Sequence, residues 1–94
     1  MPYLLVRHKV EDYARWKPIF DADAATRRAS GSQGGRLFRN TSDPNELVIL
    51  FELADLEKAR QYTQSEELRG KMQQAGVADQ PDIYFLEEVE HVPV

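Results

Sequence analysis

Apolar and polar side chains alternate along four stretches of the chain, a pattern typical of β-strands with one buried face. The clearest example lies near the start, where Leu4, Val6, His8 and Val10 fall on one side of an extended backbone. The pattern predicts strands over residues 3–10, 36–41, 46–54 and 82–90.

Between the first two strands the apolar spacing changes to that of a helix. Tyr13, Trp16, Phe20 and Ala24 recur every three or four residues. Because proline lacks a backbone N–H and clashes with the preceding turn, Pro18 predicts a short turn over residues 12–16 and a main helix that begins at the proline.

A second helical region follows the third strand. Asp55 and Ser65 are typical N-cap residues, and they predict two helical pieces ending near residues 64 and 75. Gly76 is placed to end the second piece. Residues 42–46, rich in Asp, Pro and Asn, predict the loop of a hairpin between the second and third strands.

The element order is therefore β-α-β-β-α-β, which predicts a ferredoxin-like α+β fold of the split βαβ type. In that topology the sheet is antiparallel, the first and third strands lie at its centre, and both helical regions cover one face. With 94 residues and no linker, residues 1–94 are expected to form a single domain.

The strand pattern supplies apolar side chains to both faces of this sheet. The set expected to pack against the helices is Leu4, Val6, His8, Val10, Leu37, Arg39, Leu47, Ile49, Phe51, Leu53, Ile83, Phe85 and Val89. The opposite face holds Tyr3, Leu5, Phe38, Val48, Leu50, Tyr84 and Leu86, mixed with Arg7, Arg36, Glu52 and Glu88. That second apolar surface is too large for a solvated sheet face, so we predict a homodimer packed sheet to sheet, with the charged residues at the rim or paired across the interface.

Together with the element order and the length, residues 6–17, 36–40 and 83–88 make the chain resemble the dimeric α+β barrel superfamily. More narrowly it is similar to the small antibiotic-biosynthesis-monooxygenase-like and cyclase-like members. The resemblance implies a two-subunit barrel with a cavity between sheet and helices in each subunit. Members use such cavities for cofactor-free oxidation, polyketide cyclisation, lactone isomerisation or haem degradation. Haem-degrading members carry a histidine on a helix, which neither helical region here contains, so we expect no cofactor.

The composition of the chain argues against several classes of function. Twelve Lys and Arg against 16 Asp and Glu give a net charge of −4, which argues against a nucleic-acid partner. No apolar run is long enough for a membrane span, and no secretion signal is visible, so a cytoplasmic location is expected. The chain has no cysteine and two distant histidines, so no metal site is expected.

His8 is the first candidate for catalysis, because it lies among apolar neighbours on a central strand and titrates near neutral pH. The alternative is a core histidine hydrogen-bonded to a carbonyl group or a helix side chain. Arg39, on the same face, is a candidate to hold a developing oxyanion. Its alternative is an internal ion pair with Asp23 or Glu66.

The aromatic stripe supplies candidate substrate-binding residues. Trp16 and Phe20 can stack on a planar ligand, and Tyr62 can orient a ligand oxygen through its hydroxyl. The alternative is a plain core, which a stripe at helical spacing more often forms. We therefore expect a cofactor-independent monooxygenase or cyclase acting on a small aromatic or polyketide-like molecule. The competing hypothesis is a ligand-binding or stress-associated dimer without catalysis.

Overall fold

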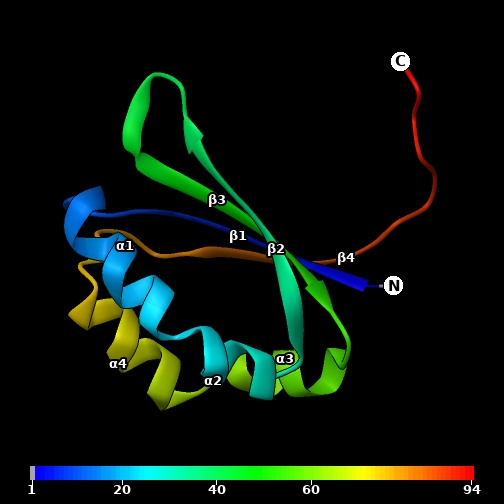
Figure 1. Cartoon of the computed structure of the whole chain (residues 1–94), viewed down its shortest axis with the longest axis horizontal. Helices are drawn as coiled ribbons and strands as arrows, with labels where there is room; N and C mark the ends of the chain where they lie inside the picture. The colour runs from blue at the N-terminus through cyan, green and yellow to red at the C-terminus, as the bar shows by residue number, and fades with distance from the viewer. Residues whose placement is uncertain (1) are drawn as a thin grey trace.

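The computed structural model describes residues 2–94 and has one antiparallel sheet with all helices on one side (Figure 1). The elements are β1 (Pro2–Lys9), α1 (Tyr13–Ala22), α2 (Ala24–Ala29), β2 (Ser32–Asn40), β3 (Asp43–Leu53), α3 (Leu56–Thr63), α4 (Glu66–Gln74) and β4 (Asp82–Glu87). The sheet order is β2-β3-β1-β4, with β1 and β3 at the centre. The predicted ferredoxin-like topology is confirmed.

The break in the first helical region lies at Asp23 and not at Pro18, so the prediction of a short turn before Pro18 is wrong. Asp12 caps α1 by accepting a hydrogen bond from the N–H of Ala14, at 3.0 Å. The helix then runs through Pro18 to Ala22. Pro18 and Ala14 are both exposed, so water can satisfy the Ala14 carbonyl that the proline leaves without a donor.

The second helical region follows the sequence prediction closely. Asp55 accepts a hydrogen bond from the N–H of Lys58, and Ser65 accepts one from the N–H of Leu68. Each cap starts its own short helix, α3 and α4. Gly76 follows α4 with a φ of 78°, a left-handed conformation that favours glycine. The second cap, at Ser65, thus explains why this region is two helices rather than one.

The inner face of the sheet carries the core. Leu47 and Leu53 of β3 are fully buried, and the rest of the predicted apolar set on β1 and β3 is buried or half-buried beneath the helices. Val89 is the exception: β4 ends at Glu87, and Val89 is 94% exposed. The predicted hairpin loop is also shorter than expected, because β3 already begins at Asp43.

The outer face of the sheet has no helix over it (Figure 1). Its side chains form rows across the strands in register: Phe38, Val48, Arg7 and Asp82; then Arg36, Leu50, Leu5 and Tyr84; then Glu52, Tyr3 and Leu86. Phe38 and Tyr84 are 49% and 55% exposed. The predicted outer apolar surface is therefore present, and no helix formed by residues 2–94 covers it.

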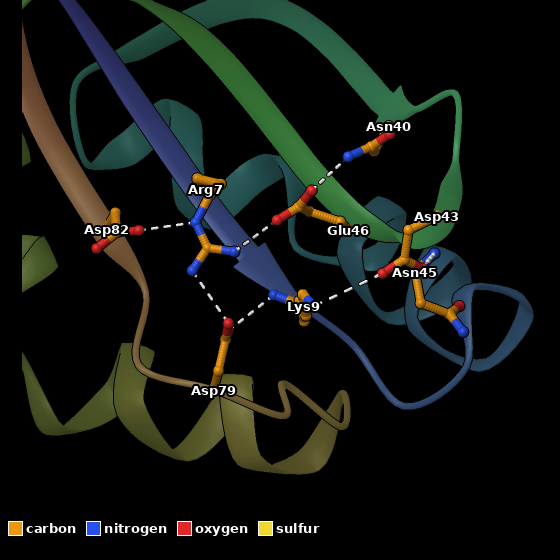
Figure 2. Close-up of polar contacts among 8 residues, drawn as sticks. All are labelled: Arg7, Lys9, Asn40, Asp43, Asn45, Glu46, Asp79 and Asp82. Atoms are coloured by element: carbon orange, nitrogen blue, oxygen red, sulfur yellow. Dashed lines mark hydrogen bonds and ion pairs between the residues drawn. The ribbon is translucent and has the colours of Figure 1, made fainter.

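One charged residue of that face, Arg7, is paired within the chain (Figure 2). Its Nε donates to Asp82 at 2.7 Å, its Nη1 to Glu46 at 3.1 Å and its Nη2 to Asp79 at 3.0 Å. The second oxygen of Asp79 accepts the backbone N–H of Lys9 at 2.8 Å. That bond and the Arg7 charge lower the pKa of Asp79. The cluster joins β1 to β3, to β4 and to the segment before β4.

Candidate functional site

A cavity of about 530 Å³ lies between the inner face of the sheet and the helices. Its walls are mainly apolar side chains from β1, β3, α1 and α4. The polar or aromatic side chains in the lining are His8, Trp16, Phe20, Asp23, Thr26, Arg27, Ser30, Ser32, Phe51, Tyr62, Thr63, Lys71 and Gln74. Apolar walls with a few polar groups are typical of small-molecule sites, and this volume falls in their usual range.

His8 projects from the central strand β1 into the lining of this cavity and is 3% exposed. Its Nδ1 is buried and has no hydrogen-bond partner among residues 2–94. Burial lowers the pKa of His8 below its ordinary value, and nearby Asp79 only partly opposes this effect. The ring is therefore neutral at pH 7. The expected alternative, a core histidine satisfied by hydrogen bonds, does not describe Nδ1.

A row of aromatic rings leads away from His8 along α1. The ring centroids of His8 and Trp16 are 5.8 Å apart in an edge-to-face arrangement. Trp16 stacks on Phe20 with centroids 4.6 Å apart and planes 22° from parallel. Phe20 in turn lies 6.4 Å from Phe51 of β3. Trp16 and Phe20 are thus both part of the core and part of the cavity wall, so the two interpretations of the stripe are not exclusive.

Three polar side chains meet where α1 gives way to α2. Asp23 accepts a hydrogen bond from the Tyr62 hydroxyl at 3.2 Å and forms an ion pair with Lys71 of α4. Burial, followed by the charge of Asp23, raises the pKa of Tyr62, so its hydroxyl stays protonated at neutral pH. Tyr62 therefore lines the cavity while its hydroxyl donates to Asp23, and its role toward a ligand stays a prediction.

Arg27 also lines the cavity, on the turn after Asp23. Its Nη1 donates to the carbonyl of Phe20 at 2.6 Å, and its guanidinium carbon lies 3.8 Å above the Phe20 ring centroid. The side chain is half-buried, and burial lowers its pKa. Arg27 adds a cation to the wall built by Trp16 and Phe20.

Arg39 lies outside this cavity, so the expectation of a buried guanidinium there is wrong. It is exposed, and its guanidinium carbon lies 4.6 Å above the ring of Tyr13 at the start of α1. Neither expected internal partner binds it: Asp23 pairs with Lys71, and Glu66 pairs with Arg69. The strand alternation gave the correct face, but β2 is an edge strand and Arg39 stands near its hairpin end, where solvent reaches it.

Sequence reasoning missed Arg27 and Lys71 and saw Asp23 only as a partner for Arg39. The four-residue spacing of Asp23 and Arg27 was a usable signal, because it places both on one side of a helix. Lys71 carried no comparable signal, since its contact with Asp23 joins residues 48 positions apart.

Residues 2–94 hold neither a cluster of metal-binding side chains nor a helix suited to a membrane. No group of three or more His, Cys, Asp or Glu side chains is close enough to hold a metal ion in this part of the chain. Over the same residues, no helix combines the length and apolar character needed to cross a membrane.

The fold and the cavity define a class: the chain has the ferredoxin-like α+β fold of antibiotic biosynthesis monooxygenase-like structures. SnoaB from Streptomyces nogalater, described as a cofactor-independent oxygenase, superposes with a TM-score of 0.75 at 15% identity, covering 99% of this chain and 97% of SnoaB. An antibiotic biosynthesis monooxygenase superposes with a TM-score of 0.70 at 15% identity over 96% of this chain and 100% of its own.

Rv0793 from Mycobacterium tuberculosis is a third similar structure, with a TM-score of 0.67 and 13% identity over 97% of this chain and 98% of its own. No family model matches the sequence, and no curated protein matches it. Identities this low establish a shared fold, so the activity has to be argued from the cavity itself.

Proposed function

We propose that this protein is a cofactor-independent monooxygenase that oxidises a small planar hydroxyaromatic or polyketide-like molecule inside the cavity. The observation that carries the proposal is His8: a neutral, buried imidazole in the cavity lining whose Nδ1 has no partner within residues 2–94. Leaving a buried polar atom unpaired costs about 1–3 kcal/mol, and such atoms call for a functional explanation. The likeness of fold to SnoaB supports the same reaction class.

In this mechanism His8 acts as the base. It takes the proton of a phenolic hydroxyl, and the resulting phenolate is electron-rich enough to reduce O₂ without a cofactor. O₂ adds at the para carbon to give a peroxide, which is protonated by the imidazolium. Removal of the para hydrogen and loss of hydroxide then leave a quinone and one water molecule. One oxygen atom of O₂ enters the product and the other leaves as water.

The remaining site residues bind and orient the substrate. Trp16 and Phe20 contribute to the apolar wall against which a small aromatic ligand would pack, and the half-buried Tyr62 lines the same cavity. Arg39 is exposed, stacks on Tyr13 and does not line the cavity, so we do not assign it the role of holding an oxyanion. Arg27 is the guanidinium that the cavity does contain.

The test is oxygen consumption with a panel of hydroxyanthrones and hydroxynaphthalenes, for the unaltered protein and for His8→Gln. The glutamine keeps a polar side chain but cannot accept a proton, so we expect turnover to fall about 10²- to 10⁴-fold. His91→Gln is the matched control, because the other histidine is exposed near the C-terminus. Full activity of His8→Gln would refute the base. Product formation without oxygen uptake would indicate a cyclase, and saturable binding without product would favour the non-catalytic hypothesis.

The outer face of the sheet supports a second part of the proposal, a homodimer joined sheet to sheet. A second copy on this face would cover Phe38, Tyr84, Leu86 and their half-buried neighbours. Removing their apolar surface from water stabilises the dimer by about 25 cal/mol for each Å² buried. Arg36 and Glu52 lie on the same face, and neither forms an ion pair with any of residues 2–94, so each is free to meet a group on a second copy. Light scattering at micromolar concentration is expected to give twice the 10.8 kDa chain mass.

The cytoplasmic location of the protein stays a prediction from the sequence.

A further inference from the structure

One carboxylate, that of Asp79, is bonded to both chain neighbours of His8 (Figure 2). Its Oδ1 accepts the backbone N–H of Lys9 at 2.8 Å, and its Oδ2 accepts an N–H from Nη2 of Arg7 at 3.0 Å. Asp79 lies in the segment between α4 and β4 and does not line the cavity beneath the helices. It therefore contacts the strand that carries the imidazole from outside the proposed site, on either side of His8.

The ends of the strands explain why β1 is held by a side chain at this point. The ladder between β1 and β4 ends at Arg7, so Lys9 lies beyond it. Ala78 donates its N–H to the Lys9 carbonyl at 2.7 Å, and the Lys9 N–H has the Asp79 carboxylate as its acceptor. An ionised carboxylate is a stronger acceptor than a neutral carbonyl. Asp79 thus extends the hold on β1 past the point where the ladder with β4 stops.

Asp79 is itself held in place by Arg7. The guanidinium also binds Glu46 of β3 at 3.1 Å and Asp82 of β4 at 2.7 Å, so three carboxylates share it. The hydrogen bond from Lys9, together with the Arg7 charge, keeps the pKa of Asp79 below its usual value, so this carboxyl is ionised at neutral pH. A fixed negative charge therefore stands beside β1, close to the proposed base.

The charges around His8 act in opposite directions. Burial has the largest effect and lowers the pKa of His8, the Asp79 carboxylate raises it, and the Arg7 guanidinium lowers it. The neighbouring elements α1 and β3 present the uncharged Trp16 and Leu47 to this position. The other titratable groups of the cavity lining stand in the helical layer: Asp23, Arg27, Tyr62 and Lys71. Asp79 is thus the carboxylate that favours the protonated ring.

We propose that Asp79 positions the base: it holds β1 on both sides of His8 and supplies the negative charge that stabilises the imidazolium formed when the substrate proton is taken up. The inference rests on the proposed function, because it takes His8 as the base. Asp79 does not line the cavity, so it acts through His8 and is a positioning residue. Its charge offsets part of the cost of placing a positive charge on a buried ring.

The first measurement is the pKa of His8, by NMR titration of its ring signals in the His91→Gln protein, where it is the only imidazole. Asp79→Asn keeps an acceptor for the Lys9 N–H and removes the charge, so we expect the pKa of His8 to fall further. Asp82→Asn is the matched control, because Asp82 binds the same guanidinium at 2.7 Å but lies on β4 and not at the Lys9 amide. It should leave the pKa of His8 nearly unchanged.

The second measurement is the exchange of the Lys9 amide hydrogen. Asp79→Ala removes the acceptor as well as the charge, so we expect this hydrogen to exchange about 10-fold faster or more, whereas Asp79→Asn retains most of the protection. Arg7 keeps Glu46 and Asp82 as partners in both variants, so we expect both to fold, and circular dichroism checks this.

Oxygen consumption then tests the effect on the reaction. The acid limb of kcat/KM reports the base of the free enzyme, so in Asp79→Asn it should move to lower pH together with the pKa of His8. An unchanged pKa of His8 in Asp79→Asn, or an equal fall in Asp82→Asn, would overturn the role of the Asp79 charge. Unchanged exchange of the Lys9 amide in Asp79→Ala would overturn the hold on the strand. A protein that shows both NMR effects but consumes no oxygen would refute the proposed function and leave the action of Asp79 on His8 standing.

Discussion

The imidazole of His8 meets the indole of Trp16 edge to face, with ring centroids 5.8 Å apart and planes at 68°. Both side chains are 3% exposed, one from the central strand and one from α1. The contact fixes the imidazole by packing rather than by a hydrogen bond at Nδ1, which has no partner in residues 2–94. Packing against Trp16 therefore holds the ring in place without a hydrogen bond at Nδ1.

A consequence for stability is that His8→Leu should not weaken the protein at pH 7. Replacing an unpaired buried polar group by an apolar one of similar size should raise the free energy of unfolding, by about 1 kcal/mol. Urea denaturation followed by Trp16 fluorescence measures this. A loss of more than about 1 kcal/mol would show that the imidazole makes a favourable interaction in the folded state.

The free energy of unfolding should also depend on pH because the His8 imidazole is buried. The pKa of His8 is below 6.5 in the folded protein and near 6.5 in the unfolded chain, so between these values only the unfolded chain binds the proton. Stability is therefore fully present above about pH 6.5 and falls as the pH drops toward the folded pKa, by at most about 1.4 kcal/mol per pH unit.

His8→Leu should abolish this slope, and His91→Gln should keep it. Measurements between pH 4.5 and 7 avoid the separate acid loss caused by Asp79, whose folded pKa lies below 3.8. A slope that survives in His8→Leu would assign the titration to another group.

Charge reversal tests the proposed dimer. Arg36 and Glu52 occupy adjacent rows of the outer face, and a two-fold axis through that face can bring each of them to the other residue of a second copy. We expect Arg36→Glu and Glu52→Arg each to weaken dimerisation about 10-fold or more, and the double variant to restore most of the affinity. Sedimentation equilibrium measures the constants. Additive losses in the double variant would show that the two residues do not meet.

The Asp23 cluster predicts a shift in tyrosine titration. Burial and the Asp23 carboxylate raise the pKa of Tyr62, so Tyr62 should ionise after an ordinary tyrosine as the pH rises. Asp23→Asn removes the negative charge and frees the Lys71 cation, and both changes lower the pKa of Tyr62. Ultraviolet absorbance of tyrosinate follows the titration, with Tyr62→Phe identifying the contribution of this side chain. An unchanged curve in Asp23→Asn would leave burial as the whole cause.

Two glycines should respond to alanine in opposite directions. At Gly35 a Cβ would stand 2.0 Å from the Leu50 carbonyl oxygen, a backbone atom that cannot move without disturbing the β2–β3 ladder, so we expect a loss of about 2 kcal/mol or more. At Gly70, in α4, a Cβ meets nothing within 4 Å, and alanine should add about 0.5–1 kcal/mol. Thermal unfolding of the two variants measures both. Equal effects would contradict the packing described at Gly35.

The sheet could be predicted because the side chains of a strand point to its two faces alternately, so the spacing of Leu4, Val6 and His8 indicates which face is buried. The helix caps Asp55 and Ser65 could be predicted as well, because each capping side chain accepts a hydrogen bond from the backbone N–H only three residues further along the chain. The prediction of a helix start at Pro18 failed because it considered only the proline and not its surroundings. Ala14 is exposed, so water can satisfy the carbonyl that Pro18 leaves without a donor, and the helix continues through the proline.

The candidate site was only partly predictable for the same reason. His8, Trp16 and Phe20 belong to periodic stretches, and the structure brings them together. Arg39 lies on the predicted face of the sheet but is exposed rather than buried. The alternation of side chains does not show where an edge strand extends beyond the helices that cover the sheet. The contact of Asp23 with Lys71 joins two separate helical regions, and one sequence contains no trace of such long-range pairing.

The helical layer is built from four short helices, of six to ten residues, each begun anew after a break. The sheet, in contrast, holds β1 between β3 and β4, and His8 itself pairs with Leu47 of β3. Substitutions in a short helix can therefore reshape one wall of the cavity without disturbing the strand that carries the imidazole. In evolutionary terms, this division lets a lineage change the shape of the cavity while it keeps the imidazole that we propose as the base.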